Sequence, residues 1–378
     1  MSKETFPPEK VSVFWFRRDL RLEDNTALAR AINSGYPVLA LFIFDTEIID
    51  ELPADDARIS FIYQQLEKIH SQLLTRGSSL HVSKGEPLAV WKELFDMYEI
   101  QAVYANKDYE PYALRRDREL GEWLQSRGIG LHLFKDQVIF EEGDILKKDG
   151  KPYTVFTPYK RKWLEKFQGS VPLIEAVESG DGFLKSSFHF PTMKDLGFTL
   201  STIEVPAYDI SNLKDYERLR NFPGPDATSH LSPHLRFGTI SIRQLIGKLG
   251  GSDEVFLSEL IWREFFMQIL FHFPEVVTQN FKPKYNGIID LIDRYQVGTE
   301  SGLAAHPLQY QLSTSAVDIN LATTRCLFVT KHRHRTACGT PQFCEKFWPA
   351  TQGETVNVLF FSDAAQGNIR TQRATRSC

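Results

Sequence analysis

Short apolar runs and helical patterns alternate along the first third of the chain. The runs are rich in β-branched and aromatic residues, which favour strands, and the segments between them space apolar residues at helical intervals. Such alternation predicts a parallel sheet with helices on both faces, and nearly continuous apolar strands fit a buried sheet. The predicted strands are 11–16, 38–44, 80–82, 102–105 and 131–134, and the predicted helices are 25–33, 57–74, 88–98 and 113–125.

The pattern changes twice after this region. We expect a five-stranded, Rossmann-like α/β domain over residues 1–134, followed by a connector over 135–210 in which turn-forming residues replace the alternation. Beyond the connector the spacing of apolar residues is helical, with predicted helices at 241–249 and 254–271. We therefore expect residues 211–287 to form a second, all-α domain.

The last part of the chain differs from the rest in composition. Residues 301–378 hold 8 Lys and Arg against 4 Asp and Glu, whereas the remainder holds 36 against 44. All four cysteines lie in this stretch, which has no clear periodicity. We expect residues 288–378 to be a divergent or out-of-frame tail, which would leave the helical domain incomplete. Sequencing of the coding region tests this expectation.

Length and composition narrow the class of protein. A chain of 378 residues with 42% hydrophobic residues is long enough for two packed domains. It has no run of 18 apolar residues and opens without the apolar core of a signal peptide, so we expect a cytoplasmic protein without a membrane span. The net charge of −4 does not favour nucleic-acid binding, although a local basic patch could still bind phosphates. The chain has neither a G-x-G-x-x-G fingerprint nor a P-loop.

Two polar stretches in the helical region carry candidate chemistry. In the first, hydroxyl groups lie ahead of Ser232, which together with the proline that follows predicts the start of a helix. The free N–H groups at such a start can bind an anion. The second stretch places a carboxylate, an indole and a guanidinium on one helix face, from Glu259, Trp262 and Arg263. These groups together can recognise a flat, polar molecule.

At these residues the chain resembles the photolyase/cryptochrome family, whose members are light-driven flavoproteins that repair pyrimidine dimers or sense blue light. Further motifs in matching order extend the resemblance from about residue 11 to about residue 287. The family's C-terminal motifs are absent beyond that point. The other motifs that agree are FRRDLR at 16–21, DNTAL at 24–28, DYEPY at 108–112 and YTVFTPY at 153–159.

The resemblance implies that FAD binds in the helical domain. Hydroxyl and backbone N–H groups suit its pyrophosphate, and an aromatic side chain suits its rings. The alternative for the hydroxyl-rich stretch is an ordinary helix cap beside a core aromatic residue. The flavin contacts implied by the resemblance are Tyr216, Thr228, Ser229, His230, Leu231, Ser232 and Phe256.

The resemblance also implies that UV-damaged DNA is the partner, with Glu259 and Trp262 as the catalytic residues. Trp262 would stack on a flipped-out dimer and Glu259 would hydrogen-bond to the pyrimidine edge; flipping costs little because a damaged pair stacks poorly. The alternative is an amphipathic helix with Trp262 in the core. The implied DNA contacts are Arg220, Glu259, Leu260, Ile261, Trp262, Arg263, Glu264, Phe265 and Phe266.

Three further features leave alternatives open. Glu110 matches a position that holds a folate antenna in some family members, but the lysine that usually accompanies it corresponds to Thr278 here. A folate, a deazaflavin or no antenna, with Glu110 as a plain surface acid, are therefore all consistent with the sequence. The basic and aromatic run at 159–163 suits either a phosphate-tracking surface or a solvated face. We expect no metal, because the spacing of His332, His334, Cys338 and Cys344 is not that of a zinc site.

Taken with the resemblance, these features predict light-driven DNA repair. The expected enzyme is a carbon–carbon lyase in which electron transfer from reduced FAD splits a cyclobutane pyrimidine dimer. A blue-light-sensing cryptochrome and an inactive, truncated family member are the alternatives. The sequence does not separate cyclobutane from (6-4) lesions. We expect a monomer that binds neither a membrane nor a metal.

Overall fold

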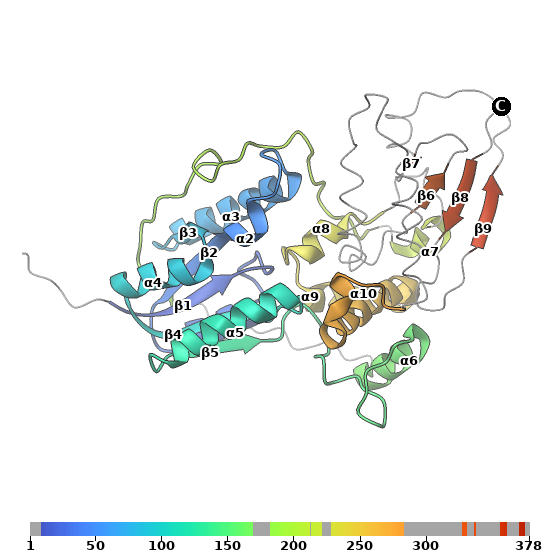
Figure 1. The fold of residues 1–378 in the computed structure, drawn as a ribbon, viewed down its shortest axis with the longest axis horizontal. Coiled ribbons are helices and arrows are strands. Elements are labelled where there is room, and N and C mark those ends of the chain that lie inside the picture. The colour runs from blue at the N-terminus through green and yellow to red at the C-terminus, as the bar shows by residue number, and fades with distance from the viewer. Residues whose placement is uncertain are drawn as a thin grey trace, which may run out of the picture. The chain divides into compact units, whose positions relative to one another are not determined.

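A five-stranded parallel sheet is formed by residues 10–134 (Figure 1). Its strands lie in the order β3-β2-β1-β4-β5, and each neighbouring pair is parallel. The predicted Rossmann-like α/β arrangement is thereby confirmed. The strands are β1 (Lys10–Phe16), β2 (Val38–Asp45), β3 (Leu80–Gly85), β4 (Glu99–Asn106) and β5 (Gly130–Phe134).

Helices cover both faces of this sheet. They are α1 (Thr26–Ile32), α2 (Thr46–Ile49), α3 (Ala57–Leu74), α4 (Pro87–Met97) and α5 (Pro111–Gln125). Successive strand residues point to opposite sides, so Phe14 and Phe16 of β1 pack with α1 and α3, whereas Val13 and Trp15 pack with α4 and α5. Burial on both faces explains why the strands read as nearly continuous apolar runs.

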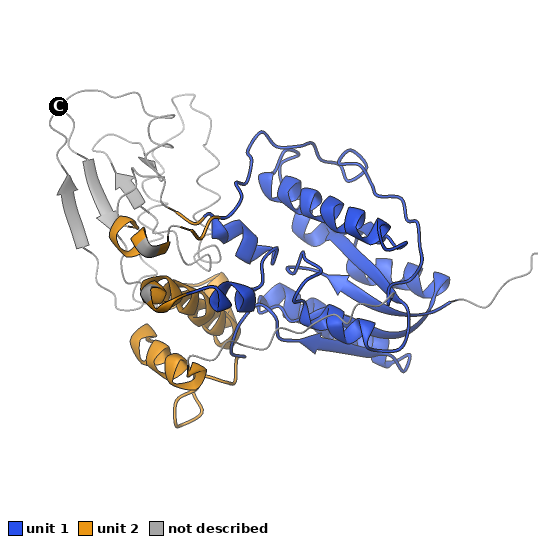
Figure 2. Ribbon diagram, turned by 180° about the vertical axis from the view of Figure 1, so that it is seen from behind, with its two compact units in different colours: residues 1–141, 170–208, 230–249 blue, residues 142–169, 209–229, 250–378 orange. Residues whose placement is uncertain are grey.

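The chain divides into two units (Figure 2). Unit 1 comprises residues 1–141, 170–208 and 230–249, and unit 2 comprises residues 142–169, 209–229 and 250–378. The structure, a computed structural model, describes residues 9–168, 182–211, 213–220 and 228–282, together with four strands between residues 327 and 374.

The units group some helices differently from the predicted domain boundaries at 134 and 210. Helices α8 (Leu231–Arg236) and α9 (Ile242–Gly247) belong to unit 1, because hydrogen bonds join residues 237 and 238 to the loop that follows β1. Helix α6 (Phe156–Phe167) belongs to unit 2 instead of acting as a plain connector. The predicted boundaries were drawn from local pattern alone, which does not reveal such long-range contacts.

The described part of the predicted helical domain, residues 211–287, is helical, as predicted. Its longest helix, α10 (Glu254–His272), ends two residues before Pro274, close to the predicted end. None of the described helices in the chain is long and apolar enough to cross a membrane. The remaining helical elements are η1 (Leu213–Asp215), α7 (Tyr216–Leu219), η2 (Gly251–Asp253) and η3 (Pro274–Val277).

Part of the predicted tail forms an antiparallel sheet, which the sequence pattern does not predict. Its strand order is β7-β6-β8-β9. The other residues after 282 lie outside the described part of the chain. The strands are β6 (Leu327–Thr330), β7 (Thr336–Ala337), β8 (Val356–Phe360) and β9 (Arg370–Ala374).

Candidate functional site

Helices α7 and α10 bring four of the predicted site residues into contact. Arg220 forms an ion pair with Glu259, and only 19% and 12% of the two side-chain surfaces are exposed. The Arg220 guanidinium also lies over the ring of Tyr216, 5.3 Å from its centroid. The ring of Tyr216 in turn meets Phe256 edge-on, with 5.1 Å between centroids. Residues predicted from separate motifs to bind flavin and DNA thus form one continuous cluster.

Trp262 lies on the same helix, but one of its neighbours covers part of it. The ring of Phe156, from α6, stacks on Trp262 with 3.5 Å between centroids and 9° between planes. Phe266 lies almost parallel to Trp262 as well, at 5.4 Å. The indole is therefore half-buried in an aromatic cluster. Its stacking on a damaged base stays a prediction.

Five of the predicted DNA contacts on α10 are buried, which does not support direct contact between these side chains and DNA. Glu264 is the clearest case, because its carboxylate accepts hydrogen bonds from the indole N–H of Trp163 at 2.7 Å and from the hydroxyl of Tyr159 at 3.3 Å. Burial, reinforced by this carboxylate, raises the pKa of Tyr159. The DNA assignment stays a prediction for Glu259, Trp262 and Phe266 on this helix. The buried residues are Leu260, Ile261, Arg263, Glu264 and Phe265.

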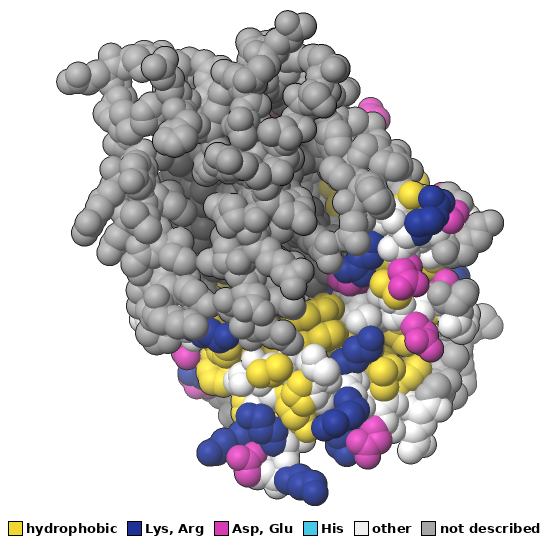
Figure 3. Space-filling view, turned by 90° about the vertical axis from the view of Figure 1, so that its right-hand side faces the viewer, with side chains coloured by type: hydrophobic (Ala, Val, Ile, Leu, Met, Phe, Trp, Pro, Cys, Tyr) yellow, Lys and Arg dark blue, Asp and Glu magenta, His cyan; other side chains and the backbone are white. Residues whose placement is uncertain are grey.

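Helix α6 separates the basic and aromatic run into two faces. Tyr159 and Trp163 are buried, whereas Arg161 is exposed and Lys162 pairs with Glu165 at 3.2 Å near the surface. Lys and Arg side chains alternate with hydrophobic and acidic ones on the face of the molecule shown in Figure 3. The aromatic half of the run is thus core, and a role for its basic half in phosphate binding stays a prediction.

The hydroxyl-rich stretch is shared between the two units. Thr228 and Ser229 belong to unit 2, and His230, Leu231 and Ser232 belong to unit 1. Helix α8 begins at Leu231 and its N-cap is His230, which has a left-handed backbone with φ of 51°. The prediction that Ser232 caps this helix is therefore wrong. Because α8 has only six residues, its terminus alone is a weak anion site, and the case for this stretch rests on its hydroxyl groups.

Glu110 forms ion pairs with two arginines. Arg236 donates to one carboxylate oxygen at 2.6 Å, and Arg18 donates to the other. Burial opposes ionisation of Glu110, but the two guanidinium groups outweigh it and lower the pKa of the carboxyl to about 2. With both oxygens engaged, these contacts favour a structural ion pair over a contact to a folate. An antenna at this position stays a prediction.

Both ring nitrogens of His234 of α8 have hydrogen-bond partners. Its Nε2 lies 3.0 Å from the carbonyl oxygen of Pro206, and its Nδ1 lies 2.7 Å from the hydroxyl of Thr239. A carbonyl can only accept, so Nε2 donates to Pro206, and in the neutral ring Nδ1 accepts from the hydroxyl of Thr239. Burial lowers the pKa of His234, as it does for His70 and His81.

These three histidines make unit 1 less stable in mild acid. Each has a folded pKa below its unfolded value, so their contribution is complete above about pH 6.5 and is lost as the pH falls below it. We expect the melting temperature to drop between about pH 7.5 and about pH 5.5, and to drop less for His234→Gln than for the wild type. Equal slopes for the two proteins would contradict the assignment to His234.

Within the described residues, no group of three His, Cys, Asp or Glu side chains could hold a metal ion. The four residues weighed for a zinc site lie outside that part of the chain; they are His332, His334, Cys338 and Cys344.

Comparison with known proteins extends these observations. Residues 12–178 match the family described as DNA photolyase. A deoxyribodipyrimidine photo-lyase from Synechococcus sp. is 32% identical over 298 residues, which is 70% of this chain and 61% of the relative. The chain belongs to the photolyase/cryptochrome family.

Solved photolyase structures share the fold. The class III photolyase from Agrobacterium tumefaciens is 24% identical, with a TM-score of 0.62 over 85% of this chain and 73% of that one. An archaeal photolyase from Sulfolobus tokodaii, described with two FAD molecules, is 27% identical, with a TM-score of 0.57 over 75% of this chain and 66% of that one. This photolyase-family chain spans between 60% and 64% of the length of three curated photo-lyases that it matches.

Proposed function

We propose that the chain binds FAD and UV-damaged DNA and acts as a deoxyribodipyrimidine photo-lyase, splitting cyclobutane pyrimidine dimers in light. The cluster of Tyr216, Arg220, Phe256 and Glu259 carries this proposal, because it unites the residues implied for the flavin with those implied for the lesion. Curated relatives with this activity match about 70% of the chain. A cytoplasmic location and a monomeric state are part of the same proposal.

The residues of the chain fit a flavin dinucleotide in their chemistry. Half-buried Tyr216 offers a ring for its flat parts, with the buried ring of Phe256 packed edge-on against it, and the hydroxyls of exposed Thr228 and half-buried Ser229 suit a pyrophosphate. His230, Leu231 and Ser232 complete the proposed set. When bound, FAD supplies the light-driven electron transfer, which no side chain of the chain provides.

The task of the protein is then to position the lesion. The ion pair with Arg220 restricts the rotamers of Glu259, so its carboxylate is aimed before a ligand arrives. Trp262 would provide a stacking surface for a base that has left the duplex. Such a grip on a lesion favours repair over blue-light sensing, because a sensor does not need to hold damaged bases.

Two measurements on the purified chain test the proposal. An absorption spectrum reports whether flavin is bound, and blue-light illumination with UV-irradiated oligo(dT) reports loss of dimers. We expect a flavin spectrum and light-dependent dimer loss. A flavin spectrum without dimer loss would indicate a sensor, and a colourless protein that gains no flavin on reconstitution would indicate an inactive family member.

Replacing Glu259 separates repair from flavin binding. We expect Glu259→Ala to lower the repair rate about tenfold, as the loss of one hydrogen bond from a charged group worth about 1.5 kcal/mol predicts, while the flavin absorbance is retained. Glu254→Ala is the matched control, because Glu254 is an exposed carboxylate in the first turn of the same helix. An unchanged rate in Glu259→Ala would remove the proposed role.

A further inference from the structure

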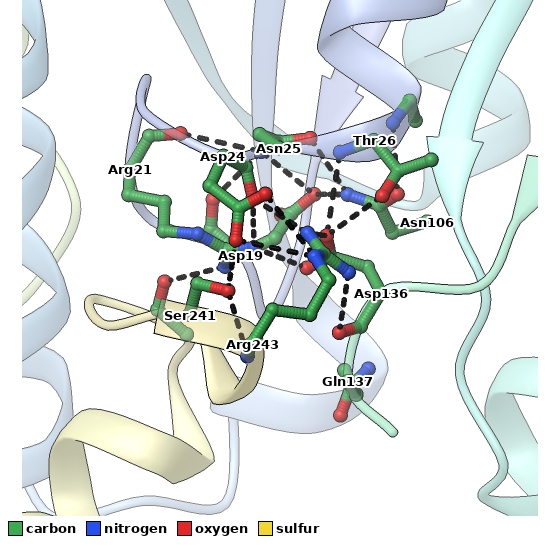
Figure 4. Close-up of polar contacts among 12 residues, drawn as sticks. Asp19, Arg21, Asp24, Asn25, Thr26, Asn106, Asp136, Gln137, Ser241 and Arg243 are labelled. Atoms are coloured by element: carbon green, nitrogen blue, oxygen red, sulfur yellow. Dashed lines mark hydrogen bonds and ion pairs between the residues drawn. The ribbon is translucent and has the colours of Figure 1, made fainter. Parts of the chain in front are cut away.

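Residues 230–249, which we call the α8–α9 segment, are attached to the rest of unit 1 by a buried arginine. The Nε of Arg243 lies 3.1 Å from both carboxylate oxygens of Asp24, and its Nη2 lies 2.7 Å from the Asp24 carbonyl and 2.8 Å from the Asp136 carboxylate. Only 8% of the Arg243 side chain is exposed. Figure 4 shows its guanidinium enclosed by these two acids. Arg243 is thus a buried ionic anchor for α9.

The loop after β1 forms further hydrogen bonds with the α8–α9 segment. Arg21 donates to the carbonyl of Gly238 at 2.9 Å and to Asp136 at 2.6 Å, and the backbone N–H of Leu20 donates to the carbonyl of Phe237 at 3.0 Å. Asp136 is therefore shared between two arginines (Figure 4). Burial opposes its ionisation, but Arg21 and Arg243 outweigh burial and lower its pKa. A carboxylate held charged in this way binds both cations at neutral pH.

A second anchor lies on α8. Arg236 bonds to Glu110, which also binds Arg18 from the loop after β1. The acid that the family resemblance links to an antenna therefore holds α8 in place. Helices α8 and α9 have six residues each, and helices this short are unstable in water without tertiary contacts. Tertiary contacts, which comprise the two anchors and the burial of apolar side chains such as Leu235 and Leu245, thus decide the conformation of the segment more than local helix propensity does.

We propose that Arg236 and Arg243 are positioning residues that set the affinity of the chain for FAD. They fix the conformation of the α8–α9 segment within unit 1, and with it that of His230, Leu231 and Ser232, which belong to the proposed flavin set. This inference rests on the proposed function. Because Glu110 binds Arg236, Glu110 would also affect flavin binding, by fixing the position of α8.

Loss of an anchor reduces the fraction of molecules whose segment is docked. The apparent Kd rises by the inverse of that fraction, so a segment docked for about a tenth of the time gives a Kd about tenfold higher. We expect this outcome for Arg243→Met, which removes the guanidinium that pairs with buried Asp24 and leaves buried Asp136 with Arg21 alone. Arg243→Lys keeps the charge but lacks the forked donor geometry, so its Kd should lie between those of wild type and Arg243→Met.

The experiment combines two readouts on the full chain. Hydrogen exchange without flavin reports docking, and we expect amides of residues 231–247 to exchange about tenfold faster or more in Arg243→Met while the amides of β1 to β5 keep their protection. Titration with FAD, followed by flavin fluorescence, reports affinity. Lys248→Met is the matched control, because Lys248 is an exposed cation directly after α9, and both readouts should equal those of wild type.

Each result decides between the proposals. A wild-type FAD affinity in Arg243→Met would overturn the inference, as would unchanged exchange in the segment. If the sheet also loses protection in Arg243→Met, Arg236→Met decides instead, because its anchor is less buried, with 25% of the side chain exposed. A wild-type chain that binds no FAD contradicts the proposed function and the flavin part of this inference, whereas faster exchange in the variants would still establish the anchors.

Discussion

Replacing Gly238 with alanine is expected to destabilise unit 1 by about 3 kcal/mol. Gly238 has φ of +65°, and an added Cβ would lie 2.6 Å from the Cα of Asp19 and closer still to the carbonyl oxygen of Arg18. These are backbone atoms, which cannot rotate away as the end of a side chain can. Hydrogen bonds from Leu20 to Phe237 and from Arg21 to Gly238 itself keep the two segments at this distance.

A second glycine provides the control for this prediction. Gly35 also has a positive φ, of +85°, but an added Cβ there meets no atom within 4 Å. Gly35→Ala should therefore cost only about 1 kcal/mol, from backbone strain alone. The measurement is the free energy of unfolding in urea for both variants. Equal losses would contradict a close approach between Gly238 and the loop after β1.

Replacing Glu264 is expected to give the second large effect. In Glu264→Leu the indole of Trp163 and the hydroxyl of Tyr159 lose the acceptor they share inside unit 2, which should cost about 3 kcal/mol. Glu264→Gln retains a carbonyl oxygen of similar reach and should lose less than half of that. Denaturant unfolding followed by tryptophan fluorescence measures both variants.

Glu165 is the control for Glu264. It lies on α6 with 66% of its side chain exposed and pairs only with Lys162 among the ion pairs of the described residues. Glu165→Ala should change the free energy of unfolding by less than about 0.5 kcal/mol. If Glu264→Leu were as stable as Glu165→Ala, the carboxylate would not hold α6 against α10.

The local pattern of hydrophobic and polar residues is sufficient to predict the sheet and the helices that cover it. Each of the five strands and each of the four helices predicted there is present, because a strand buried on both faces needs an apolar run and a helix packed on it needs an apolar stripe. The N-cap of α8 lies two residues before the predicted one, since His230, not Ser232, precedes the first turn in a left-handed conformation. Non-glycine residues adopt that conformation uncommonly, although His, Asn and Asp do so more often than others, and local pattern gives no sign of it at His230.

The burial of Glu264 is a feature that the spacing of residues along the chain does not predict. The spacing of Glu259, Trp262 and Arg263 indicated a polar face on α10, but the helix is buried on nearly all sides. A charged residue enters such a helix only when partners are available, and those of Glu264 include Trp163, 101 positions away in the chain. The ion pair of Arg220 with Glu259 likewise depends on how α7 meets α10.

Sequence alone therefore determined the α/β order of elements, the helical character of residues 213–282 in the described part, and the family to which the chain belongs. These follow from residue spacing and from motifs, both of which are local properties. Tertiary structure decided which charges are buried and paired, above all Arg243 with Asp24 and Asp136. Such pairs join residues as far as 219 positions apart, and their free energy depends on the desolvation and geometry that only the folded chain creates.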